Sequence, residues 1–298
     1  MINDTVKSGG GSPPQGCTLC PVKCGAIRSE RAGACGADDN VRIAKFYLHK
    51  GEEPVISGTN GSGTVFFCGC SLRCVFCQNY ELSRSLRGKT FTVKELAEIF
   101  KKLESDGAHN INLVTATQYA DKVIEALKIY APAVPILYNT HGYERIETLK
   151  TLNDFVSVYL PDLKFYSPAV SARYTGKNNY FEIASRAIEY MANKPIAFGE
   201  DGLMKSGTIV RHLVLPQNVP DSLSVLDFLS DFKDKIYLSV MSQYTPYGDI
   251  KNLPELNRKI TKREYDKVVE YAVSLGFTNM FFQDEKSASE EYIPRWDF

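Results

Sequence analysis

The chain has 298 residues, of which 44% are hydrophobic, so it can bury one substantial core in one large α/β domain or two small ones. Lysine plus arginine and aspartate plus glutamate both number 35, and this balance gives no overall field that would attract nucleic acid or a membrane surface. No apolar run approaches the roughly 18 residues of a membrane-spanning helix. We therefore expect a protein that binds neither nucleic acid nor membrane.

The amino terminus is predicted to be a flexible tail. Residues 1–16 are rich in Gly, Ser and Pro, a composition typical of flexible segments. They lack the charged-then-apolar order of a secretory signal peptide. Eight cysteines in a chain without an export signal favour metal thiolates in a reducing compartment, so we expect a cytoplasmic protein.

Residues 17–62 are predicted to be a cysteine-rich extension with a second metal site. Its cysteines are separated by two, three and ten residues and are Cys17, Cys20, Cys24 and Cys35. Four thiolates at these spacings suit one tetrahedral site, which fits structural zinc or an iron–sulfur cluster. A second [4Fe–4S] cluster could relay electrons, which favours iron–sulfur. Disulfides or unliganded thiols are the alternatives.

Residues 63–80 hold a short apolar run followed by three closely spaced cysteines. Val65–Phe67 is long enough only for a buried strand, and Gly69 ends it. The cysteines that follow have C-x3-C-x2-C spacing and are Cys70, Cys74 and Cys77. Three thiolates are one ligand short of the four that hold an iron–sulfur cube, so one iron would stay open to another ligand. The alternative is three small buried residues on one face of a helix.

Further along, apolar segments with strand and helix spacing alternate. We predict strands at Ile111–Val114, Ile136–Tyr138, Val156–Leu160, Ile209–Leu215, Ile236–Val240 and Asn279–Phe282. We predict helices at Phe91–Glu104, Asp121–Tyr130, Arg145–Leu152, Phe181–Met191, Leu223–Phe232 and Lys262–Leu275. Such alternation implies parallel strands with right-handed crossovers, and hence a partial (β/α)6 TIM-like barrel over residues 63–283. Residues 284–298 are predicted to form a tail packed near the barrel mouth.

The cysteine motif carries a family resemblance. C-x3-C-x-F-C, with Phe76 before the last cysteine, resembles the signature of the radical S-adenosylmethionine (SAM) enzymes. The stretches GSGTVFFCGCSLRCVFCQNYELS, YLPDLKFYSP and QDEKSASEEYIP resemble the pyruvate formate-lyase activating enzyme-like (PflX-like) branch. The resemblance implies the same barrel and a [4Fe–4S] cluster whose open iron is chelated by the amino and carboxylate groups of SAM. It further implies an oxidoreductase that splits SAM to a 5′-deoxyadenosyl radical, with a flavodoxin- or ferredoxin-type electron donor.

Polar side chains cluster at the ends of the predicted strands, where parallel α/β folds form their sites. After the second strand, relatives carry a Gly-Gly-Glu stretch that meets the SAM amino group, and this chain has Thr-Ala-Thr-Gln at 115–118. Hydroxyls, an amide oxygen and backbone carbonyls could replace the missing acid; alternatively, the threonines only cap the next helix. The candidate SAM-binding residues are Phe76, Thr115, Thr117, Gln118, Asn139, Thr140, Asp162, Lys164 and Gln243.

Two of these segments resemble parts of glycyl-radical activating enzymes that hold SAM and a monovalent cation. Asn139 stands where relatives carry Asp, which removes one charge from a cation site, while Asp162 still offers an oxygen ligand. Lys164 could meet the SAM carboxylate or a substrate acid. A surface pair between Asp162 and Lys164 is the alternative.

Candidate substrate-facing residues are Arg211, His212 and His141. A guanidinium at a strand end can form two hydrogen bonds to a carboxylate or can hold a loop, and either histidine can instead be a hydrogen-bonded structural residue. Cys68 is expected to be a small buried residue without a ligand role, and the segment His49–Glu53 receives no role.

Three functions fit the sequence. The first is a radical SAM enzyme that abstracts hydrogen from a small-molecule or peptide substrate. The second is an activase that installs a glycyl radical in a partner enzyme, although activases with extra clusters carry the extra cysteines after the SAM motif and this chain carries them before it. The third is a non-catalytic iron–sulfur module for electron transfer.

Overall fold

The structure is a computed structural model that describes residues 16–283. The predicted amino-terminal tail, apart from Gly16, and the predicted carboxyl-terminal tail lie outside the described residues. Within 16–283, no helix is both long and apolar enough to cross a membrane.

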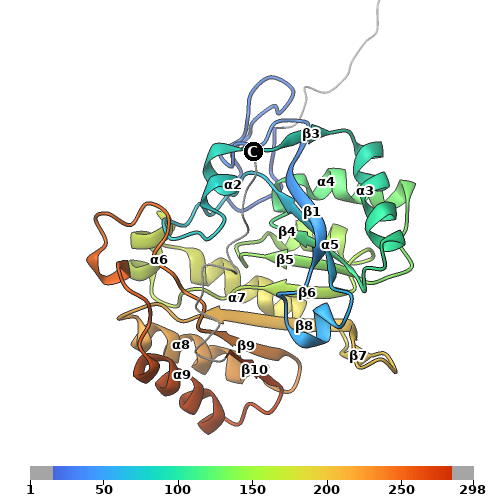
Figure 1. Cartoon of the computed structure of the whole chain (residues 1–298). Coiled ribbons are helices and arrows are strands. Elements are labelled where there is room, and N and C mark those ends of the chain that lie inside the picture. Colours follow the sequence, from blue (N-terminus) through green and yellow to red (C-terminus); the bar gives the residue numbers. More distant parts are fainter. Residues whose placement is uncertain (1–15, 284–298) are drawn as a thin grey trace, which may run out of the picture.

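One curved sheet organises the described chain (Figure 1), and its strand order is β10-β9-β8-β6-β5-β4-β2-β1-β3. Neighbouring strands from β2 to β10 run parallel. They are β2 (Ser62–Phe67), β4 (Ile111–Val114), β5 (Ile136–Thr140), β6 (Val158–Pro161), β8 (Met204–Leu213), β9 (Tyr237–Met241) and β10 (Met280–Phe282). Helices separate these strands along the chain, which confirms the predicted partial barrel.

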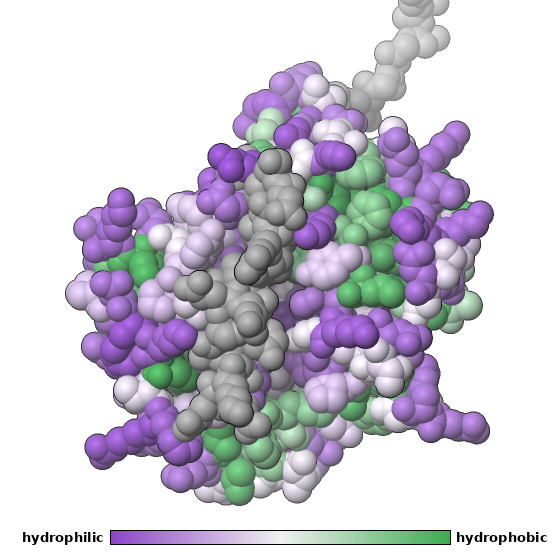
Figure 2. All heavy atoms as spheres, viewed as in Figure 1, coloured by the Kyte–Doolittle hydropathy of each residue, from purple (hydrophilic) through white to green (hydrophobic). Residues whose placement is uncertain are grey.

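Most of the helices pack outside the sheet. The helices in chain order are α1 (Pro54–Ser57), α2 (Tyr80–Ser85), α3 (Val93–Ser105), α4 (Ala120–Ile129), α5 (Ile146–Leu152), α6 (Pro168–Thr175), α7 (Tyr180–Met191), α8 (Val219–Ser230) and α9 (Lys262–Ser274), with 3-10 turns η1 (Thr117–Tyr119) and η2 (Pro254–Leu256). Thr92 caps α3 in a capping box with Glu95. Figure 2 shows hydrophilic side chains on both sides of the visible face, near α3 and near α6 and α9.

Two antiparallel strands extend the sheet beyond β2, and the sequence did not predict them. β1 (Val41–His49) pairs with β2, and β3 (Lys89–Phe91) pairs with β1. A further short strand, β7 (Ala197–Phe198), pairs antiparallel with β8. Most side chains of β1 are only half-buried, because this strand lies near the edge of the sheet, and the apolar signal is correspondingly weak. Part of the predicted extension therefore belongs to the main sheet.

The short helix α1 fills the inside of the sheet below the candidate site. Ile56 is 1% exposed and packs against Leu137, Leu160 and Ile209. Side chains alternate along a strand, so the next inward residues toward the carboxyl ends are polar: Asn139, Asp162 and Arg211. An apolar floor thus lies under a polar layer, and the segment before α1 passes directly between them.

Candidate active site

A cavity of about 200 Å³ lies at the carboxyl ends of the parallel strands, where the sequence predicts the site. Its lining comprises His49, Gly51, Glu52, Phe66, Cys70, Cys74, Phe76, Cys77, Gln78, Asn79, Val114, Thr115, Asn139, Thr140, His141, Asp162, Lys164, Arg211, Leu213, Met241 and Gln243. Twelve of the residues predicted to hold the cluster, SAM or substrate lie in or directly after strands β2 to β6. Ten of these twelve line the cavity. Thr117 and Gln118 are buried behind the wall.

The three cysteine sulfurs after β2 face this cavity. Burial raises the pKa of all three thiols, but backbone N–H groups of Leu72 and Arg73 donate to the Cys70 sulfur and so favour its thiolate. Cys77 accepts similar bonds from the Asn79 backbone and the Ser83 hydroxyl. Among residues 16–283, no three His, Cys, Asp or Glu side chains converge closely enough for a single ion. Backbone N–H and hydroxyl donors at these sulfurs are contacts that favour the thiolate form, which is the form that ligates a metal centre.

The loop that carries these cysteines is fixed from two sides. Gln118 Nε2 lies 3.0 Å from the carbonyl oxygens of both Cys68 and Gly69 and donates to the Thr115 oxygen at 2.8 Å. The Gln118 amide nitrogen therefore ties the end of β2 to the end of β4. From the other side, the backbone N–H of Cys70 donates to the Cys35 carbonyl at 3.2 Å. Cys68 is buried and donates its thiol to a backbone carbonyl, in agreement with a non-ligand role.

Phe76 belongs to an aromatic cluster beside the cysteines. Its ring makes edge-to-face contacts with Phe165, Tyr174 and Tyr244, and it is 4% exposed. It also lines the cavity, so a place in this aromatic cluster is compatible with the predicted contact between Phe76 and SAM.

Four charged side chains form one network across the cavity. Arg211 Nε donates to Asp162 Oδ1 at 2.9 Å, and Lys164 Nζ donates to Asp162 Oδ2 at 2.5 Å. Arg211 also meets Glu52 Oε2 at 3.2 Å and Asn139 Oδ1 at 2.6 Å. Burial acts to raise the pKa of Asp162, but the positive charges of Arg211 and Lys164 outweigh it and hold this pKa below its usual value. Asp162 and Lys164 therefore do form a pair, but it lies in the cavity and not on the surface, as the alternative to a binding role had it.

Glu52 is the member of this network that the sequence did not reveal. Its Oε1 accepts from Asn112 Nδ2 at 2.8 Å and from Asn139 Nδ2 at 3.3 Å. The following Glu53 has an Oε2 atom without a hydrogen-bond partner among the described residues, and burial raises its pKa. The run His-Lys-Gly-Glu-Glu does not indicate that any of its side chains points into the barrel, because charged runs usually face solvent.

The two predicted substrate-facing histidines have different surroundings. His141 lines the cavity, its Nδ1 accepts from the Tyr143 backbone at 3.1 Å, and its Nε2 lies 3.2 Å from Ser71 Oγ. His212 is on the opposite face of β8, where Nδ1 lies 2.7 Å from the Leu163 carbonyl and Nε2 lies 2.9 Å from Ser222 Oγ. The prediction that His212 faces a substrate is therefore wrong, because alternation along β8 turns it toward α8 and away from the cavity.

The threonines at the ends of β4 and β5 surround a buried acid. Thr115 lines the cavity with φ of 57°, a left-handed conformation that is rare for a branched residue. Thr117 Oγ1 donates to Glu144 Oε1 at 2.5 Å, and Thr140 Oγ1 donates to the same oxygen. Tyr138 adds a longer bond of 3.4 Å to the other oxygen of Glu144. The sequence did not point to Glu144, which precedes α5.

Gln243, at the end of β9, closes the cavity from the remaining side. Its backbone oxygen accepts from Gln78 Nε2 at 3.0 Å, and its side-chain oxygen accepts from Gln283 Nε2 at 3.3 Å. These bonds connect the cysteine loop, β9 and the end of β10.

The four amino-terminal cysteines lie together, as the sequence predicts. Electrostatic interactions connect Cys20 with Cys17 and Cys35, and Cys24 shares a hydrogen bond with Cys17. At Cys20, Cys24 and Cys35, the backbone N–H group two residues further on donates to the sulfur. All four are free thiols, so disulfides are not formed. The segment docks on α5, where Thr148 Oγ1 donates to the Leu19 carbonyl at 2.7 Å.

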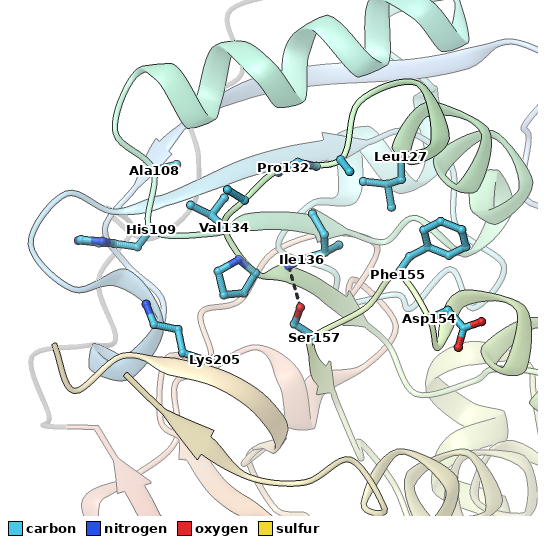
Figure 3. A pocket seen from close by; sticks show the side chains of 13 residues that line it. Ala108, His109, Leu127, Pro132, Val134, Ile136, Asp154, Phe155, Ser157 and Lys205 are labelled. Carbon is cyan, nitrogen blue, oxygen red and sulfur yellow. Dashed lines mark hydrogen bonds between the residues drawn. The ribbon is translucent and has the colours of Figure 1, made fainter. Parts of the chain in front are cut away.

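A second cavity, of about 630 Å³, lies at the amino ends of β5 and β6 (Figure 3). Its wall is mostly apolar, and Asp154 lies on the far side from His109 and Lys205. Lys205 forms a salt bridge with Asp201 at 3.0 Å. None of the residues predicted for the site is present, so this cavity does not belong to it.

Comparison with known proteins agrees with the geometry. The model of the Radical SAM superfamily matches residues 64–229, more than half of the chain. The uncharacterized protein MJ0674 of Methanocaldococcus jannaschii is 30% identical over 266 residues, which cover 86% of this chain and 74% of that protein.

Two solved structures are similar in fold. The crystal structure of Streptococcus suis SuiB bound to S-adenosylmethionine has a TM-score of 0.50 and 15% identity over 72% of this chain. This chain spans 48% of the SuiB chain, and at such identity the likeness indicates the fold alone. A domain of pyruvate-formate lyase-activating enzyme from Bacteroides vulgatus has a TM-score of 0.41 and 14% identity over 56% of this chain and 92% of that one, which is too distant to carry an argument.

Proposed function

The chain belongs to the radical SAM superfamily, and on that premise we propose that Cys70, Cys74 and Cys77 hold the [4Fe–4S] cluster of an enzyme that acts on a small-molecule or peptide substrate. When bound, this cluster supplies the electron that splits SAM, and the resulting radical abstracts a hydrogen atom. The observation that carries the proposal is that the three thiols share one cavity with charged groups from β6 and β8. A bare electron-transfer module has no need of such a polar cavity.

Each charged group then has a binding role. Lys164 has two N–H bonds left after its contact with Asp162, and it lies close enough to Cys74 for their charges to interact. This position suits the carboxylate of SAM. Arg211 lies farther along the sheet and is held by Glu52 and Asp162, which suits a polar group of the substrate.

A monovalent cation at Asp162 receives no support from these contacts. Both oxygens of Asp162 already accept hydrogen bonds from cationic side chains. A cation would have to displace Lys164 or Arg211, so we leave it out of the proposal.

We also propose that Cys17, Cys20, Cys24 and Cys35 hold a second metal centre, either zinc or a [4Fe–4S] cluster. The adjoining thiols and their N–H donors support metal thiolates over idle cysteines. The contact between Cys17 and Cys24 suits zinc, in which sulfurs about 2.3 Å from one tetrahedral ion are close to one another. The absence of a converged three-ligand group in 16–283 suits a wider cluster, so metal analysis must decide.

Electron paramagnetic resonance tests the proposed function. The reduced protein is expected to give a [4Fe–4S] signal that changes when SAM is added, because SAM binds the open iron. A Cys74→Ser variant is expected to lose this response. An unchanged signal in the wild type would contradict the proposal. Adding co-encoded glycyl-radical enzymes, with a flavodoxin- or ferredoxin-type donor, tests the activase alternative: a new protein-based glycyl radical would favour it over a small substrate.

A further inference from the structure

The buried pair of His141 and Ser71 has a defined hydrogen-bond direction. Nδ1 of His141 accepts from the backbone N–H of Tyr143 at 3.1 Å. Burial and the positive charge of Lys164 lower the pKa of His141 to about 4, so the ring is neutral at pH 7 and its one proton is on Nε2. Nε2 therefore donates to Ser71 Oγ at 3.2 Å. The serine oxygen is the acceptor, and its own proton is not used in this bond.

A second buried pair, His212 and Ser222, has the opposite direction. Nδ1 of His212 lies 2.7 Å from the Leu163 carbonyl oxygen, which can only accept, so Nδ1 carries the proton. Burial lowers the pKa of His212 to about 4, so this ring is also neutral. Its Nε2 atom then accepts from the Ser222 hydroxyl at 2.9 Å. The proton of Ser222 thus has an acceptor within the protein, which the proton of Ser71 lacks.

The Ser71 hydroxyl is left with a proton to donate. Ser71 is 5% exposed, and His141 is the hydrogen-bond partner of its hydroxyl among residues 16–283. A buried O–H group that donates to nothing is unfavourable, because it has lost its bond to water. This hydroxyl therefore fits an acceptor that a bound group supplies.

The position of this hydroxyl is beside the three cluster cysteines. Ser71 directly follows the first of them in the sequence. The ring of His141 and all three cysteine sulfurs interact electrostatically with the Lys164 ammonium, and these residues line the same cavity. Because Ser71 Oγ is 3.2 Å from His141 Nε2, it lies on the cysteine side of that cavity. The sulfurs of an iron–sulfur cluster accept hydrogen bonds of this kind.

We propose that the Ser71 hydroxyl donates a hydrogen bond to a sulfur of the cluster held by Cys70, Cys74 and Cys77, and that His141 is the positioning residue that directs this proton. The inference rests on the proposed function, since it requires the cluster. A hydrogen-bond donor stabilises the more negative, reduced cluster, so the bond raises the reduction potential. It gives His141, a candidate for substrate contact, a role on the cluster side of the cavity.

A redox titration of the reconstituted protein, followed by electron paramagnetic resonance without SAM, tests this inference. Ser71→Ala is expected to lower the ratio of reduced to oxidised cluster at a given potential about tenfold, a shift of about 59 mV for one electron. His141→Leu is expected to shift the potential in the same direction. His141→Gln, whose amide N–H can replace Nε2, is expected to stay near the wild type. In the Ser71→Ala background, His141→Leu is expected to cause no further shift.

Ser222→Ala is the matched control. It removes a buried serine hydroxyl from the other histidine pair, where the proton already has an acceptor. We expect this variant to lower the thermal midpoint and to keep the wild-type reduction potential. Iron content and thermal midpoint are measured for every variant, which separates loss of the cluster or of the fold from a change in potential. If Ser71→Ala holds no cluster, the difference between His141→Leu and His141→Gln still tests the direction of the bond.

A wild-type potential in Ser71→Ala would overturn the inference. A shift that appears only after SAM is added would also overturn it, because the acceptor would then be SAM. Equal effects of His141→Leu with and without the Ser71 hydroxyl would mean that His141 does not act through Ser71. In each case a wild-type cluster that responds to SAM would leave the proposed function standing, whereas a wild type without a cluster at these cysteines would contradict the function itself.

Discussion

The backbone N–H of Cys70 donates to the carbonyl oxygen of Cys35 at 3.2 Å, so the first cluster cysteine is bonded directly to the amino-terminal cysteine group. The backbone of Cys35 thus joins the amino-terminal cysteine group to the loop of the proposed active-site cluster. A metal that fixes Cys35 would therefore also fix the position of Cys70.

We predict a second metal centre with an influence on the first. Wild-type protein should contain about four irons and one zinc, or about eight irons, per chain. Cys20→Ser should remove the second metal and lower the thermal midpoint and the active-site iron, because Cys35 loses its anchor. Metal analysis of both proteins checks this. Wild-type protein with about four irons and no further metal would contradict it.

Gly69 is predicted to be essential for this contact. Its φ is 85°, and a Cβ atom would lie 2.8 Å from the Cys35 carbonyl oxygen. Gly176 also has a positive φ, 71°, but a Cβ there meets nothing within 4 Å. Gly176→Ala should therefore cost only the left-handed strain, about 1 kcal/mol. Gly69→Ala should cost clearly more free energy of unfolding and also reduce bound iron.

Chemical denaturation of these two glycine variants measures the difference. Equal losses, with iron content unchanged in both, would mean that the close approach of Gly69 to Cys35 does not hold the loop.

The charge network around Arg211 gives a prediction about stability. Glu52→Ala leaves the Nη1 group of Arg211 and two asparagine amides without this acceptor inside the barrel, and removal of one partner from a buried pair costs about 3–5 kcal/mol. Glu147→Ala, which breaks the exposed pair with Arg145, should cost less than about 1 kcal/mol. Urea unfolding of both variants tests this. Similar small losses would show that Glu52 is solvated in solution.

The buried acid Glu144 predicts a dependence of stability on pH. Burial raises its pKa from 4.5 to about 7, against the lowering effect of the three hydroxyls. The protonated form is favoured in the folded state, so its contribution to stability is complete below about pH 4.5 and is lost as the pH rises through 7. Relative to Glu144→Gln, the wild type should lose roughly 3 kcal/mol over this window.

Urea unfolding of the reconstituted protein at several pH values, without SAM, checks this dependence of the free energy of unfolding on pH. Parallel pH profiles of wild type and variant would exclude a raised pKa at Glu144.

Much of the barrel could be predicted because its signals are local. Parallel strands such as Ile111–Val114 are short apolar runs, and α9 begins at the predicted Lys262. The three cluster cysteines were recognisable because their close spacing alone indicates ligands of a metal cluster. β1 was not predicted, because a strand near the edge of the sheet with half-buried side chains lacks a clear apolar pattern.

The remaining parts of the site depend on tertiary contacts that no local pattern encodes. Glu52 reaches Arg211 across 159 positions of sequence, and the packing of Ile56 together with the bonds between the Glu52 backbone and Ser57 Oγ holds it there. Glu144 is recognisable only when β4 and β5 bring Thr117 and Thr140 onto one carboxylate. His212 was predicted on the wrong face, because a histidine in an apolar strand carries no sign of which way it points.

The most direct measurement is the formation of 5′-deoxyadenosine from SAM by the reconstituted, reduced protein. The wild type is expected to release this nucleoside, and Cys74→Ser, which removes one thiolate of the proposed cluster, is expected to release none above background. Wild-type protein that holds about four irons per chain and yields no 5′-deoxyadenosine would contradict the account. Equal yields from wild type and Cys74→Ser would contradict it as well.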